Sequence, residues 1–115
     1  MYIVFKQKDD VIQPLYPCND DQESESVIAD KSLCDSKDTA IFSLYAGDYK
    51  FEKSPTVITN GIYFILKIIN GKADKILKAS SHYYALKSIV DFLNVEINNP
   101  AIEYKVCSVS GTLIE

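Results

Sequence analysis

The sequence predicts an α+β domain, a mainly antiparallel sheet of about five strands with one principal helix, His82 to Leu93, packed on one face. Three observations predict this class. An apolar run from Ile62 to Ile69 is followed by Asn70-Gly71, and Asn-Gly is a strong hairpin signal because both residues accept positive φ. A later segment repeats apolar residues at helical spacing, and several short segments alternate apolar and polar residues as half-buried strands do.

The hairpin and helix form the centre of the predicted fold. A buried helix is the rival interpretation of Ile62 to Ile69, but Asn60-Gly61 and Asn70-Gly71 bound the run and favour a strand that returns from Lys72 to Ser80. Ser80 and Ser81 then offer a hydroxyl to start the helix, and Asn94 is its expected left-handed terminator. The apolar stripe recurs at i, i+3, i+4 and i+7, with Tyr83 and Phe92 beside it: Leu86, Ile89, Val90 and Leu93.

The other strands are expected on either side of this unit. Their ranges are Tyr2 to Gln7, Val11 to Tyr16, Thr39 to Ala46, Tyr49 to Lys53 and Ala101 to Val109. Pro14 cannot donate to a ladder, so the second of these is expected to be an edge strand or no strand. No internal repeat is evident along the chain, and residues 1–115 are expected to form a single domain.

An acidic loop is predicted at about residues 18–38. Residues 19–26 contain no apolar side chain, and at most one short helical turn is expected there. A loop of this length within a compact domain is usually functional or disordered.

Size and composition limit the classes of protein. The chain has 115 residues and 47% apolar content, enough for a globular core. No stretch approaches the roughly 20 apolar residues of a membrane helix, and the first residues lack the pattern of a signal peptide. We therefore expect a cytoplasmic protein that does not insert into a membrane.

Charge indicates the kind of partner. All 12 basic side chains are lysines, and the absence of arginine makes nucleic-acid recognition and phosphoryl chemistry unlikely uses of the chain. Residues 1–60 hold 6 Lys and 11 Asp plus Glu, a net charge of −5, whereas residues 61–115 hold 6 and 5, a net charge of +1. A partner steered by charge should therefore present a basic surface.

The sequence predicts no catalytic residue, metal or cofactor. His82 is the single histidine. The spacing of residues along the sequence identifies no second residue that would act with it as a catalytic base or as a ligand. Cys18, Cys34 and Cys107 include no C-x-x-C pair, so zinc would require four distant segments to converge. A disulfide between Cys18 and Cys34 is expected only if the protein is exported.

The predicted function is a non-catalytic protein-binding module that blocks a basic surface of a protein partner. In size and charge the chain is similar to small acidic immunity proteins and to phage-encoded inhibitors of host defence. The alternatives are an assembly subunit that pairs through a sheet edge near Tyr2 to Phe5 or Ala101 to Val109, and a small ligand-binding protein or enzyme using His82. Monomer and homodimer both stay open. The expected partner-binding residues combine carboxylates with tyrosines: Asp20, Asp21, Glu23, Glu25, Tyr45, Asp48 and Tyr49.

Overall fold

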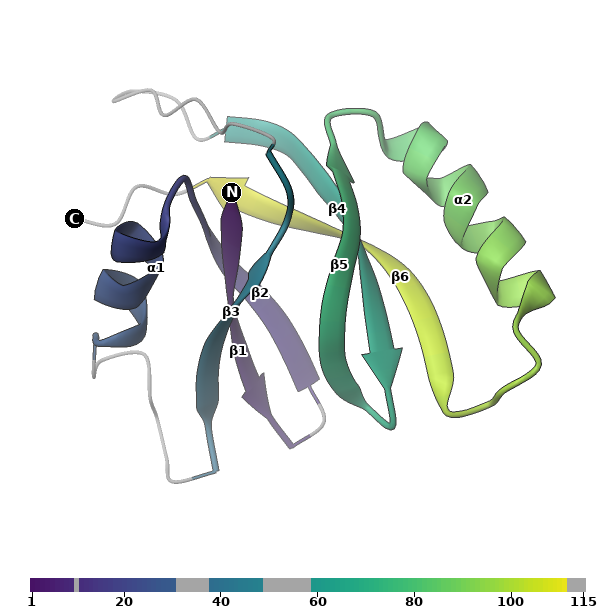
Figure 1. Ribbon diagram of the computed structural model, residues 1–115, viewed down its shortest axis with the longest axis horizontal. Helices are drawn as coiled ribbons and strands as arrows, with labels where there is room; N and C mark the ends of the chain where they lie inside the picture. Colours follow the sequence, from purple (N-terminus) through teal and green to yellow (C-terminus); the bar gives the residue numbers. More distant parts are fainter. Residues whose placement is uncertain (10, 31–37, 49–58, 112–115) are drawn as a thin grey trace.

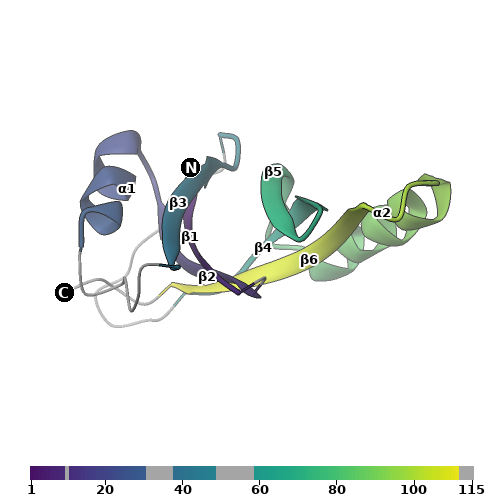
Figure 2. The same cartoon turned by 90° about the horizontal axis from the view of Figure 1, so that it is seen from below.

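The computed structural model describes residues 1–9, 11–30, 38–48 and 59–111. In this part of the chain, two three-stranded antiparallel sheets face each other, and one helix covers the outer side of each sheet (Figures 1 and 2). The α+β class is confirmed. The single sheet of about five strands is not, because the strands divide into two sheets and a second helix is present.

Among the described residues, the two halves of the chain share one order of elements, strand-strand-helix-strand. The first half holds β1 (Tyr2–Lys8), β2 (Val11–Cys18), α1 (Asp21–Ile28) and β3 (Ala40–Tyr45). The second half holds β4 (Thr59–Ile69), β5 (Lys72–Ser80), α2 (Tyr83–Glu96) and β6 (Ile102–Gly111). The sheet orders, β2-β1-β3 and β5-β4-β6, are also equivalent. The structure therefore contains an internal repeat that the sequence analysis did not detect.

The central strand of each sheet, β1 and β4, buries side chains on both of its faces. In β1, Ile3 and Phe5 belong to the core between the sheets, whereas Val4 packs with α1. In β4, Phe64 faces the inter-sheet core and Ile65 packs under α2. Each central strand is thus apolar on both faces because each face is covered, one by a helix and the other by the opposite sheet.

Aromatic side chains join the sheets. The Phe5 ring stacks on Phe42, with centroids 5.5 Å apart, and meets Phe64 edge-on at 5.7 Å. Such pairs add to the stabilisation from buried area. The core therefore belongs to both halves of the chain.

The predicted hairpin is present. Asn70 has φ 52° and Gly71 has φ 77°, the left-handed conformations that this turn requires, and β5 returns antiparallel to β4. By contrast, Asn60-Gly61 does not bound the strand. It lies within β4, where the register against β6 shifts between Thr59 and Ile62, as it does at a β-bulge.

The order of the strands in each sheet tests two further expectations about which strands lie at an edge. β2 is an edge strand, as Pro14 predicts. Tyr2 to Phe5 lies in β1, which pairs with a strand on both sides, so the alternative of assembly through an open edge there is wrong. Residues 101–109 fall mostly in β6, which is at a sheet edge. The strand predicted at residues 49–53 lies outside the described residues.

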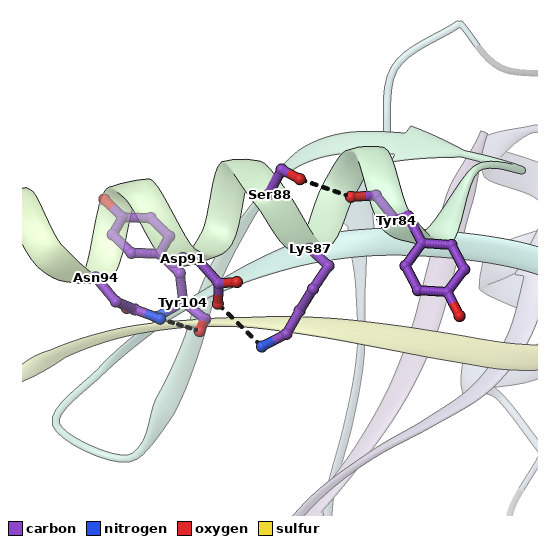
Figure 3. Close-up of polar contacts among 6 residues, drawn as sticks. All are labelled: Tyr84, Lys87, Ser88, Asp91, Asn94 and Tyr104. Atoms are coloured by element: carbon purple, nitrogen blue, oxygen red, sulfur yellow. Dashed lines mark hydrogen bonds and ion pairs between the residues drawn. The ribbon is translucent and has the colours of Figure 1, made fainter.

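The principal helix is confirmed and runs further than expected. His82 is the N-cap residue, and its N–H donates to Ser80 Oγ at 3.1 Å. Leu86 and Val90 are buried with Ile65. The helix continues through Asn94 because the Asn94 amide donates to the Tyr104 carbonyl and accepts from its N–H, both at 3.1 Å (Figure 3). Asn94 therefore ties α2 to β6, and its prediction as the terminator is wrong.

Candidate protein-binding surface

Within the acidic loop expected at about residues 18–38, residues Asp21–Ile28 form the helix α1, which is longer than the one short turn expected, and residues 31–37 lie outside the described residues. Asp20 caps α1, its Oδ1 accepting the Glu23 N–H at 2.8 Å, and Glu23 Oε2 accepts the Asn19 N–H at 3.0 Å. The Asp20 bond satisfies an N–H group that the helix start leaves without a partner, the Glu23 bond ties the residue before the cap to the first turn, and carboxylates there interact favourably with the helix dipole. The same residues that make the segment acidic also make it helical.

Buried contacts hold α1 against its sheet. Val27 is 4% exposed and packs with Cys18 and Val4, which are fully buried. Ser24 is also buried, and its hydroxyl donates to the Asp21 carbonyl at 2.9 Å. The outward side of α1 carries only polar side chains: Asp21, Gln22, Glu25 and Ser26.

Two tyrosines connect α1 with the end of β3. Tyr2 and Tyr45 are paired in register on β1 and β3, and their ring centroids lie 5.2 Å apart. The Tyr2 hydroxyl bonds to the Asp21 carboxylate, and this bond is the main cause that raises the pKa of Tyr2 above 10.0. The Tyr45 hydroxyl donates to Asp48 Oδ1 at 2.6 Å, which likewise raises the pKa of Tyr45. Each phenol is thus held protonated beside a carboxylate.

A turn after β3 places Asp48 beside Tyr45. The Ala46 N–H donates to the Met1 carbonyl at 2.8 Å, which extends the pairing with the first strand. Gly47 then adopts φ 88°, a conformation that favours glycine. The Asp48 side chain then lies within reach of the Tyr45 hydroxyl.

We name the resulting group the acid–tyrosine surface, defined by Tyr2, Asp21, Glu25, Tyr45 and Asp48. Of the residues expected to bind a partner, the structure links Asp21, Tyr45 and Asp48 through Tyr2. Glu25 is exposed one helical turn beyond Asp21, whereas Asp20 and Glu23 act as caps. Tyr49 lies outside the described residues.

Tyr2 is the member that the sequence analysis missed. The sequence places Tyr2 in the opening strand, and the alternation of side chains along that strand could have shown which face of the sheet Tyr2 lies on. Ile3 and Phe5 face the inter-sheet core, so even-numbered positions must face the other side of the sheet. The covering of that side by an acidic helix is a tertiary contact.

Charge is separated along the molecule. Residues 11–30 contain five carboxylates and no lysine. In the other half, Lys72, Lys75 and Lys78 are exposed on β5. The acid–tyrosine surface and β5, which also carries the exposed Asp74, therefore have net charges of opposite sign.

His82 is the residue on which the alternative of an enzyme or a ligand-binding protein depends. His82 begins α2, is exposed and forms no side-chain capping bond. Asp91 on the same helix pairs with Lys87 at 3.0 Å, and Asp48 accepts from Tyr45. A hollow of about 450 Å³ lies at the Lys72 end of β5, whereas His82 follows the Ser80 end.

Cys18 is fully buried, Cys107 is half-buried, and burial raises the pKa of the Cys107 thiol. Cys34 lies outside the described residues. Within the described ranges, no three His, Cys, Asp or Glu side chains are grouped to hold a metal ion, and no helix there is long and apolar enough to cross a membrane.

Comparisons with protein-family models, curated proteins and solved structures found no match to this chain.

Proposed function

We propose that the protein is a non-catalytic binding module of the cytoplasm, a small acidic inhibitor or immunity-type protein that covers a basic surface of a protein partner. The observation that carries this proposal is the acid–tyrosine surface. It joins carboxylates from α1 and from the turn after β3 through two tyrosine rings 5.2 Å apart.

The geometry suits recognition of lysine or arginine. A carboxylate oxygen that accepts from a phenol keeps further lone pairs for a cationic donor. The phenol bonds also restrict the side chains before binding, which lowers the entropy lost on association. Tyrosine adds contact area at small entropic cost, as it does in many binding surfaces.

Electrostatic steering would set the rate of association. Five carboxylates without a lysine in residues 11–30 create a local negative field. Such a field accelerates encounter with a basic partner and weakens as salt increases. The expected kinetic signature is a salt-dependent association rate with a less salt-dependent dissociation rate.

The test compares three chains as bait in lysate of the source cell. The first is the wild type, and the second carries Asp21→Asn, Glu25→Gln and Asp48→Asn. The matched control removes three exposed carboxylates away from this surface, with Asp38→Asn, Asp74→Asn and Glu103→Gln.

A partner captured by the wild type and the control, lost from the second chain and released by salt supports the proposal. Purified with that partner, the second chain should associate about tenfold or more slowly at low salt. Equal capture by all three chains would remove the acid–tyrosine surface from the function.

A further inference from the structure

The outer side of α2 carries an apolar stripe that its counterpart α1 lacks. Tyr84, Phe92 and Val95 are 83%, 64% and 82% exposed. With Ser88 they recur at spacings of four, four and three residues, which places them on one side of the helix. This side is opposite Leu86 and Val90, which are buried against the sheet. By contrast, the exposed positions of α1 are all polar.

We propose that this stripe is the interface of a homodimer, in which α2 packs antiparallel against α2 of a second copy around a two-fold axis. The assignment extends beyond the proposed function and does not depend on it. It rests on the self-complementary order of side chains along the helix.

Size complementarity is the first argument. The midpoint of α2 lies between residues 89 and 90. An antiparallel second copy brings together residues equally far from this point on opposite sides. Tyr84 then lies opposite Val95 of the second copy. The large Phe92 lies opposite the small Ser88, with an offset of about one residue, or about 1.5 Å along the helix axis. The Ser88 hydroxyl already donates to the Tyr84 carbonyl at 3.1 Å (Figure 3), so its burial leaves no unsatisfied donor.

Charge complementarity is the second argument. Lys87 and Asp91 lie on one flank of the stripe and form an ion pair at 3.0 Å (Figure 3). They are placed almost symmetrically about the midpoint of the helix, so Lys87 of each copy approaches Asp91 of the other. The two-fold axis therefore brings unlike charges together twice, whereas a parallel two-fold arrangement would place the two charged flanks on opposite sides of the helix pair.

Area indicates a weak dimer. An aromatic side chain carries about 150 to 250 Å², so Tyr84 and Phe92 at the stated exposures present roughly 300 Å² in each copy. With Val95, two copies would bury roughly 800 Å² of apolar surface, less than the about 1,200 to 2,000 Å² of stable interfaces. We therefore expect a dimer that forms only at high protein concentration.

Light scattering and sedimentation from about 1 µM to about 1 mM test the proposal. The wild type should pass from monomer to dimer, and Phe92→Asp should weaken association by about 30-fold or more, as for a central aromatic residue. The matched control is Val11→Asp, because Val11 is 66% exposed on β2, and it should dimerise like the wild type. A wild type that stays monomeric, or a dimer that persists in Phe92→Asp, would overturn the proposal.

Cross-linking tests the antiparallel geometry. Tyr84→Cys and Val95→Cys are made separately in a chain with Cys34→Ser and Cys107→Ser, while the fully buried Cys18 is kept. A reagent that spans about 8 to 10 Å, the usual separation of packed helices, should join the two variants only when they are mixed. Alone, each pair of like positions is about 16 Å apart. Efficient cross-linking of either variant alone would contradict the antiparallel arrangement.

Discussion

Truncation of Leu86 to alanine should lower the unfolding free energy more than truncation of Phe92, although leucine is the smaller side chain. Leu86 is fully buried against Ile65 and Val90, whereas Phe92 is 64% exposed on the other side of the same helix. Leu86→Ala removes three buried carbon groups, about 2.4 kcal/mol of transfer free energy. The cavity left behind raises the expected loss of unfolding free energy to about 3 to 5 kcal/mol.

Phe92→Ala removes more atoms but should cost less than about 0.5 kcal/mol, because its ring is largely in water and alanine favours the helix. Ile89→Ala should fall between the two, at about 1 to 2 kcal/mol, because Ile89 is half-buried at the margin of the same cluster. The three substitutions share one helix, so differences in secondary structure do not explain the ranking.

The assay is urea unfolding followed by far-ultraviolet circular dichroism, at concentrations low enough to keep the protein monomeric. Equal midpoints for Leu86→Ala and Phe92→Ala would refute the assignment of the buried and exposed sides of α2. A larger loss for Phe92→Ala would refute it more strongly.

Three other results are expected. Asp20→Ala should lower the unfolding free energy by about 1 kcal/mol through loss of the Glu23 N–H bond, and Asp20→Asn, which can still cap, should restore most of it in the same urea assay. Gly71→Ala should cost about 1 kcal/mol because of its positive φ, and an equally stable variant would contradict the turn conformation. The raised pKa of Tyr45 means that its bond to Asp48 stabilises the fold below pH 10 and is lost as pH rises through the folded pKa. Absorbance titration near 295 nm should show one tyrosine pKa falling in Asp48→Asn, and an unchanged titration would contradict the bond.

The two proposed surfaces lie at opposite ends of the molecule. In Figure 1, α1, which carries Asp21 and Glu25 of the acid–tyrosine surface, lies at one end and α2 lies at the other. A dimer built on α2 would therefore leave both acid–tyrosine surfaces outermost and free. Two such surfaces on one particle would bind a repeated or dimeric basic partner with avidity that a monomer lacks.

Local chemistry in the sequence determined the hairpin and the principal helix. Asn70-Gly71 is suited to a turn with positive φ because of its own residues, and the buried positions Leu86 and Val90 follow from helical spacing alone. These features depend on neighbours within a few positions along the chain. The edge position of β2 could likewise be predicted from Pro14, which lacks an N–H wherever it lies.

Only the tertiary structure decided how the strands divide and which polar residues meet. A strand that is apolar on both faces, such as Ile62 to Ile69, shows that both faces are buried, yet a helix and a second sheet exclude water equally well. The acid–tyrosine surface is also non-local, since Tyr2 meets Asp21 and Tyr45 only after β1, β3 and α1 have packed. Burial of an apolar face is favourable whether a helix or a second sheet covers it. Which of the two covers each face therefore depends on how the whole chain packs.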